Sequence, residues 1–456
     1  MCSPFMSYLK KPLFWAFLII FIAFPNIRAQ KPNFLIVIAD DLNKDSLPCY
    51  GNKDAITPNI DRLAKEGMVF ENAFTTTAMC APTRTQLYTG LFPFKSGAYP
   101  NHSRVKEGVT SIVHDLKELG YRVGLNGKSH VKPMKSFPFE RLGKGNFSAK
   151  KIKEFVHRSK DQPFCLVLAS HSPHVPWKSG DASQFSAESL TIPEYWIDTP
   201  EVRSALTRYY GEVNDLDREL GECLKIVNQA GFEKNTVVIF TTEQGSQMPG
   251  CKWTCYESGL NLGLLIKWPN VTKPGRRSDA WVHHIDLRPT LVDIVGGVNR
   301  VGLDGKSFLP VLKGETDKHR TVTYGAHTQM GAIGSPKNGY PVRSIRKGNY
   351  KLILNLNEKV EYSNALTTND NESYWKSWLE ASSSGDPRSS FLVQRYLNRP
   401  AIEFYNLALD PHELNNLASN ALYSEIISDL KHSLNKWMIS QGDLGMESEL
   451  RAKSRK

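Results

Sequence analysis

The chain has 456 residues, of which 40% are hydrophobic and 23% are charged. This composition is typical of a folded globular protein and excludes a disordered one. The length exceeds what one hydrophobic core usually supports and therefore predicts two domains. The net charge of +11 favours polyanionic partners, but no basic run with interleaved aromatic residues accompanies it, which argues against nucleic acid.

The first 29 residues differ from the rest of the chain. Lys10 and Lys11 precede an apolar run over residues 13–24, and Ala29 offers a small residue for cleavage. This pattern predicts a signal peptide, since the run is too short to favour a permanent membrane helix. The alternative is an uncleaved anchor. We therefore expect an exported protein, periplasmic or secreted (lysosomal in a eukaryotic host), without stable membrane insertion.

Short apolar runs rich in β-branched residues recur along the chain, with amphipathic stretches such as 58–67 and 110–120 between them. The runs cover residues 34–38, 121–125, 165–169, 236–240 and 264–266. Alternating strand and helix patterns predict an α/β fold with a large, mostly parallel sheet that helices cover on both faces.

Polar side chains follow four of these runs directly. They are Asp40 and Asp41, Lys128 and His130, His171 and His174, and Glu243 and Gln244. Ligands of open α/β sheets bind outside the carboxyl ends of the strands. We therefore expect these eight side chains to gather at one edge of the sheet.

The C-terminal part of the chain has a different pattern. Residues 340–345 and 350–354 flank a turn-like segment and predict a β-hairpin. The polar, serine-rich stretch 363–386 is expected to be a long surface loop, and residues 424–438 a helix. We expect a catalytic domain over residues 30–335 and a smaller α+β domain with an antiparallel sheet over residues 336–456.

Cys80 precedes Pro82, which is suited to the first turn of a helix that runs toward Gly90. Helix N-termini bind anions through free N–H groups and the helix dipole. Arg84 lies one turn further along on the same face. The segment therefore indicates an anion site, although a buried cysteine before an ordinary helix is the simpler alternative.

Asp40 and Asp41 place two carboxylates at the end of one strand, and Glu243 with Gln244 adds oxygen atoms at the end of another. Hard divalent cations prefer such ligands, and Ca²⁺ tolerates variable geometry better than Mg²⁺. The pattern favours one bound Ca²⁺. The alternative for the Asp-Asp pair is a helix cap.

The segment Cys80-x-Pro82-x-Arg84, followed by Thr89-Gly90, resembles the signature of type I sulfatases, which belong to the alkaline phosphatase superfamily. The elements G-K-x-H at residues 127–130 and P-H-x-P at residues 173–176 are similar to further motifs of that family. Within it, the chain is most similar to the heparan sulfamidases (N-sulfoglucosamine sulfohydrolases) and to bacterial polysaccharide sulfatases such as the ulvan-active ones. The resemblance implies an alkaline-phosphatase-like fold.

The resemblance also implies a role for each residue that matches a family motif. A maturation enzyme would oxidise Cys80 to formylglycine, whose hydrate is the nucleophile and a ligand of the Ca²⁺ beside Asp40, Asp41, Glu243 and Gln244. Arg84 would support the nucleophile, Lys128 and Lys252 would contact sulfate, His130 would act as a base, and His174 would protonate the leaving group. His171, His327 and Arg343 are candidate sugar contacts. Glu243 departs from the family pattern, in which an aspartate is usual.

These observations together predict an exported sulfatase that removes sulfate from a sulfated carbohydrate, either an algal polysaccharide such as ulvan or a glycosaminoglycan such as heparan sulfate. One alternative is a phosphodiesterase or phosphonate hydrolase of the same superfamily. Another is a glycan-binding pseudo-sulfatase, which the unusual Glu243 suggests.

Overall fold

The computed structural model describes residues 1, 3, 31–158, 161–330, 332–369 and 373–455. Pro32–Lys456 form one compact unit. The predicted signal peptide lies outside the described residues, apart from residues 1 and 3. In the part that the structure describes, no helix is both long and apolar enough to span a membrane.

The centre of the unit is an eight-stranded sheet with the order β4-β3-β5-β1-β6-β7-β2-β8. Its strands are β1 (Asn33–Ala39), β2 (Met68–Phe74), β3 (Arg122–Gly127), β4 (Glu140–Arg141), β5 (Phe164–Ala169), β6 (Thr236–Thr242), β7 (Asn261–Lys267) and β8 (Arg276–His283). The strands from β4 to β6 are parallel, whereas β7 runs antiparallel to both of its neighbours. The predicted mostly parallel sheet is thus confirmed.

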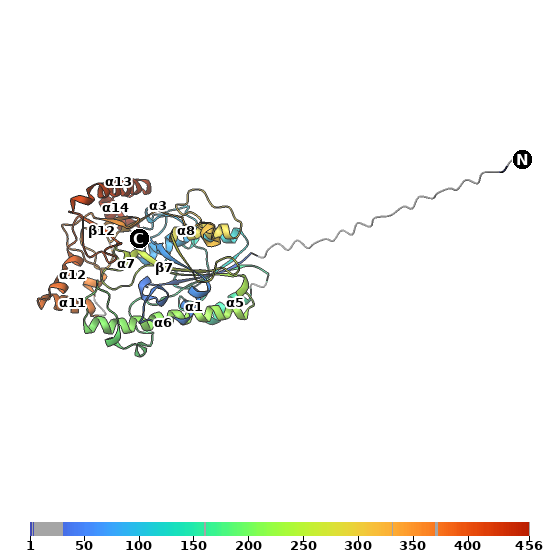
Figure 1. Cartoon of the computed structure of the whole chain (residues 1–456), viewed down its shortest axis with the longest axis horizontal. Coiled ribbons are helices and arrows are strands. Elements are labelled where there is room, and N and C mark those ends of the chain that lie inside the picture. Colours follow the sequence, from blue (N-terminus) through green and yellow to red (C-terminus); the bar gives the residue numbers. More distant parts are fainter. Residues whose placement is uncertain (2, 4–30, 159–160, 331, 370–372, 456) are drawn as a thin grey trace. The chain divides into compact units, whose positions relative to one another are not determined.

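The sheet is covered on both faces because its central strand is apolar on both sides. Leu35 and Val37 of β1 belong to one buried cluster, and Phe34 and Ile36 to a second one on the opposite face. The first cluster includes side chains of α1 (Pro58–Glu66), α5 (Ala149–His157) and α6 (Pro200–Gln229), which lie on one side in Figure 1. The second includes side chains of α2 (Cys80–Thr89), α4 (Ile112–Glu118), α8 (His284–Ile294) and α9 (Leu309–Lys313).

A second sheet of four antiparallel strands follows, in the order β12-β11-β10-β9. It consists of β9 (Val322–His327), β10 (Val342–Lys347), β11 (Tyr350–Asn355) and β12 (Ile402–Asn406). β10 and β11 form the predicted hairpin, with Gly348 in its turn at φ +57°. Side chains of this sheet, of α3 (Pro93–Ser96) and of α13 (Ser424–Gln441) form a third buried cluster. α7 (Glu257–Leu260) precedes β7, and α14 (Met446–Arg451) follows α13.

The predicted surface loop over residues 363–386 is wrong. The segment contains α10 (Ala365–Thr368) and α11 (Tyr374–Ser383), and α12 (Pro387–Leu397) follows it. Trp375 and Trp378 of α11 are buried, and α11 contacts α6 and α12 (Figure 1). Although the segment is rich in serine, its aromatic residues recur at helical spacing and form a buried stripe on an otherwise polar helix.

Candidate active site

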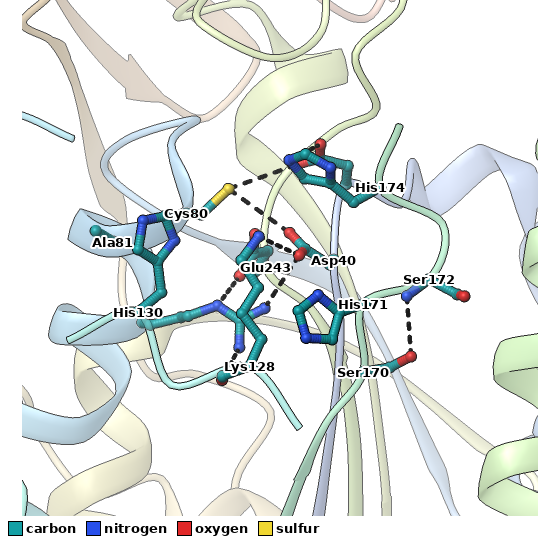
Figure 2. A network of polar contacts seen from close by, with 12 residues as sticks. Asp40, Cys80, Ala81, Lys128, His130, Ser170, His171, Ser172, His174 and Glu243 are labelled. Atoms are coloured by element: carbon teal, nitrogen blue, oxygen red, sulfur yellow. Dashed lines mark hydrogen bonds and ion pairs between the residues drawn. The ribbon is translucent and has the colours of Figure 1, made fainter. Parts of the chain in front are cut away.

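The carboxyl ends of four adjacent parallel strands form the site (Figure 2). Asp40 and Asp41 follow β1, Lys128 follows β3, His174 lies in the loop after β5, and Glu243 follows β6. Because β3, β5, β1 and β6 are neighbours in this order, their ends meet at one edge. The structure brings together the side chains that the strand-end pattern selects.

Cys80 is the first residue of α2 and faces the two aspartates. Its Sγ lies 3.6 Å from Asp40 Oδ1 and 3.8 Å from Asp41 Oδ1, and the side chain is 1% exposed. Burial and the nearby Glu243 carboxylate raise the pKa of the Cys80 thiol well above its ordinary value. An unmodified thiol here is therefore protonated and a weak nucleophile.

Three cationic side chains oppose three carboxylates around Cys80. Lys252 Nζ lies 2.6 Å from Asp41 Oδ2, Lys128 forms an ion pair with Asp40, and Arg84 forms an ion pair with Glu243. Arg84 also lies 3.7 Å from Asp40 Oδ2 and donates to the main-chain oxygen of Lys128 at 3.0 Å. The three positive charges face at most three negative ones, so a bound divalent cation would leave the site positive and suited to an anion.

The pKa values of these groups follow from burial and pairing. Burial alone would raise the pKa of Asp40, but Lys128, a hydrogen bond with Glu243 and Arg84 hold it well below its usual value. Glu243 behaves in the opposite way, because burial raises its pKa to about 8 in spite of Arg84. Burial would lower the pKa of Lys252, but Asp41 and Cys80 raise it. Of the two neighbouring carboxyl groups Asp40 and Glu243, Asp40 is therefore the one that stays ionised.

The residues around Cys80 fit a hard cation. Asp40, Asp41, Cys80 and His174 each offer one ligand atom within 4.8 Å of the others. The amide nitrogen Nε2 of Gln244 lies 2.5 Å from Asp41 Oδ1, 3.0 Å from Glu243 Oε1 and 3.4 Å from Cys80 Sγ. The amide oxygen Oε1 of Gln244 is buried without a hydrogen-bond partner. Turning this amide would present an oxygen to a cation among the same groups. Glu243 is engaged with Arg84, so it is less free to act as a ligand than the sequence suggests.

Three histidines line the site. Burial, Lys128 and Arg84 lower the pKa of His130 to about 2, and its Nδ1 is buried without a partner. His174 donates through Nδ1 to the oxygen of Val175 at 2.5 Å, which leaves Nε2 facing Asp41 Oδ2 at 3.6 Å. His171 is exposed and bonds the main-chain oxygen of Gly145 at 2.9 Å.

The structure adds two residues that the sequence patterns did not select. Asn101 Oδ1 accepts hydrogen bonds from the main-chain N–H groups of Ala81 (3.2 Å) and His102 (3.1 Å). His102 Nδ1 lies 2.7 Å from His130 Nε2. Both residues lie in the loop after α3, which follows no strand of the sheet, and therefore no strand-end signal marks them.

The candidate sugar contacts His327 and Arg343 lie on β9 and β10 of the second sheet and are buried. Both side chains are 0% exposed, and Arg343 forms a two-point ion pair with Asp443 at 2.5 and 3.0 Å. Burial lowers the pKa of His327 to about 3. Neither side chain is accessible to a sugar in this structure.

The eight-stranded sheet and the helices that cover it form an alkaline-phosphatase-like fold. The family model described as "Sulfatase" matches residues 32–149 and 144–298 of this chain. A second model, "N-sulphoglucosamine sulphohydrolase, C-terminal", matches residues 251–373. The chain therefore belongs to the sulfatase family and is a sulfuric ester hydrolase.

Individual relatives agree with this assignment. An ulvan-active sulfatase of Formosa agariphila is 32% identical over 92% of this chain and 82% of its own length. Human N-sulphoglucosamine sulphohydrolase is 28% identical over 90% of each chain. The fold is shared with a protein whose structure was solved in complex with its substrate D-glucosamine-2-N,6-O-disulfate. The TM-score is 0.69 and the identity 19%, over 91% of this chain and 99% of that one. The fold is also shared with a phosphonate monoester hydrolase of Agrobacterium radiobacter (TM-score 0.70, 18% identity, 90% and 96%).

Proposed function

We propose that this sulfatase is exported and removes sulfate groups from a sulfated carbohydrate, with a formylglycine derived from Cys80 and one bound Ca²⁺. The observation that carries the proposal is the position of Cys80. It begins α2 within 3.8 Å of a carboxylate oxygen of Asp40 and of Asp41, in a cluster of charged side chains that also contains Arg84, Lys128 and Lys252. The relatives that act on ulvan and on N-sulfoglucosamine support a carbohydrate as the substrate.

Asp40, Asp41, Gln244 and the oxidised residue 80 would hold the cation, with His174 next to them and Glu243 engaged by Arg84. When the two groups are in place, formylglycine supplies the attacking hydroxyl and the cation stabilises its negative charge. A maturation enzyme that oxidises Cys80 is the partner that this chemistry requires.

The side chains of this protein have separate tasks in the reaction. Lys128 and Lys252 neutralise the sulfate oxygens, whose charge is spread over the whole sulfuryl group. His174, with its Nδ1–H bonded to Val175 and Nε2 turned to the site, would give a proton from Nε2 to the leaving oxygen or nitrogen in its doubly protonated, imidazolium form. His130 would accept a proton at Nδ1 in the step that releases sulfate.

A substrate panel tests the proposal. We expect sulfate release from at least one sulfated oligosaccharide among heparan, chondroitin, ulvan and carrageenan fragments, and none with the Cys80→Ala variant. A peptide that contains residue 80 should have the mass of formylglycine in the active protein. An unmodified Cys80 in active protein would contradict the mechanism.

The choice of sulfate over phosphate needs its own comparison, because a phosphonate monoester hydrolase shares this fold. We expect 4-nitrophenyl sulfate to be hydrolysed with a higher kcat/KM than bis(4-nitrophenyl) phosphate. A reversed preference would favour the phosphodiesterase alternative.

A further inference from the structure

We infer that His102 is a positioning residue for the reaction, and that it accepts a hydrogen bond from His130 Nε2 and thereby leaves the lone pair of His130 on Nδ1. The inference deepens the proposed function, in which His130 is the base. It starts from a contact that lies outside the strand-end pattern, between the loop after α3 and the loop after β3.

The two imidazoles form a close pair. His130 Nε2 and His102 Nδ1 are 2.7 Å apart, and the ring centroids are 4.6 Å apart with 48° between the ring planes. Both residues have a left-handed backbone, with φ of +62° for His102 and +52° for His130. Residues other than glycine rarely adopt this backbone conformation, and the exceptions are concentrated at functional sites.

The loop that carries His102 is attached to the nucleophile. Asn101 Oδ1 accepts from the N–H of Ala81, the neighbour of Cys80, and from the N–H of His102. Lys132 Nζ donates to the main-chain oxygen of His102 at 3.4 Å. One amide side chain therefore links the start of α2 to His102, and His102 in turn contacts the base.

The direction of the hydrogen bond follows from the other nitrogen of His130. A neutral imidazole carries one N–H and one lone pair. If His102 were the donor, the proton of His130 would lie on Nδ1, which is buried without a partner. A buried N–H without an acceptor is costly, and such orphaned donors are rarer in proteins than acceptors with an unused lone pair. With His130 Nε2 as the donor, Nδ1 instead holds a lone pair, which is what a base needs.

The same hydrogen bond strengthens during the reaction. When Nδ1 accepts a proton, His130 becomes a cation and its Nε2–H bond to His102 becomes charge-assisted. The charges of Lys128 and Arg84 act against that cation, so a neutral acceptor on the far side of the ring is useful. His102 itself carries its proton on Nε2.

The test compares two substitutions in the matured, full-length enzyme. His102→Gln keeps an acceptor for His130 Nε2, whereas His102→Leu removes it. We expect His102→Leu to lower kcat for 4-nitrophenyl sulfate by about tenfold to a hundredfold with little change in KM, the usual range for losing the partner of a functional histidine. His102→Gln should restore most of kcat. His432→Leu, on the exposed side of α13, is the control for replacing a surface histidine.

A spectroscopic measurement separates this inference from the proposed function. In ¹⁵N-histidine-labelled wild-type protein, His130 should be protonated at Nε2 and not at Nδ1, whether or not the protein releases sulfate. A proton on Nδ1 would overturn the inference. So would equal values of kcat for the Gln and Leu variants. Absence of sulfate release with the expected tautomer would instead count against the proposed function alone.

Discussion

Lys252 shows how strongly single charges depend on one another in the site. It is 3% exposed, and its ion-pair partner in the described part of the chain is Asp41. Removing one member of a buried ion pair leaves the other charge without compensation. The positive charge of Lys252 therefore serves the stability of the site as well as its affinity for anions.

We expect Lys252→Met to lower the free energy of unfolding by about 3 kcal/mol, as measured by urea denaturation. Added Ca²⁺ should recover part of the loss, because a cation beside Asp41 replaces the missing positive charge. Lys150→Met, on the exposed side of α5, is the matched control and should change little. If Ca²⁺ does not improve the stability of Lys252→Met, the proposed cation does not lie next to Asp41.

Among the elements, α11 is the one whose burial depends most on distant parts of the chain. Trp378 is 2% exposed, whereas its neighbour Leu379 is 39% exposed. The helix contacts α6, which precedes it by more than a hundred residues. The apolar side of α11 is therefore buried only when α6 packs against it.

We expect Trp378→Ala to lower the free energy of unfolding by about 3–5 kcal/mol, because it leaves a cavity in the core. Leu379→Ala should stay within about 0.5 kcal/mol of wild type, as surface substitutions usually do. Thermal and urea unfolding of both variants provide the comparison. Similar losses for the two would show that α11 does not pack as described.

For the whole molecule, buried neutral histidines determine part of the response to acid. Burial lowers the pKa of His284 and of His327 to about 3 and that of His283 well below its ordinary value. Above pH 6.5 these groups are neutral in the folded and in the unfolded chain. Below pH 6.5 the unfolded chain binds protons that the folded protein does not, so stability falls as the pH decreases toward about 3.

Each such histidine should contribute a slope of about 1.4 kcal/mol per pH unit in that window. We therefore expect the free energy of unfolding to decrease more steeply below pH 6 in wild type than in His284→Gln, by about that amount. Urea titrations between pH 7.5 and 4.5 measure the slope independently of any constant destabilisation by the substitution. Parallel slopes would mean that His284 titrates normally in the folded protein.

Prediction from the sequence succeeded where the signal is local. Five strands of the large sheet can be found from their apolar runs, and the polar residues after four of them can be assigned to one edge because parallel strands end together. The edge strand β8, with Arg276 and Arg277 at its start, lacks a continuous apolar run and was not found. The reversed direction of β7 was not predicted either, since a run of apolar residues does not indicate strand direction.

The sequence by itself determined the family and enzyme class of this protein, because the motif around Cys80 and the polar residues after each strand are encoded over a few consecutive positions. The tertiary structure decided which of those groups interact. It paired Glu243 with Arg84, placed the amide nitrogen of Gln244 beside Asp41, buried the side chains of His327 and Arg343, and brought His102 to His130. These contacts join residues far apart in the chain, and only the packing of loops on the finished sheet determines their distances.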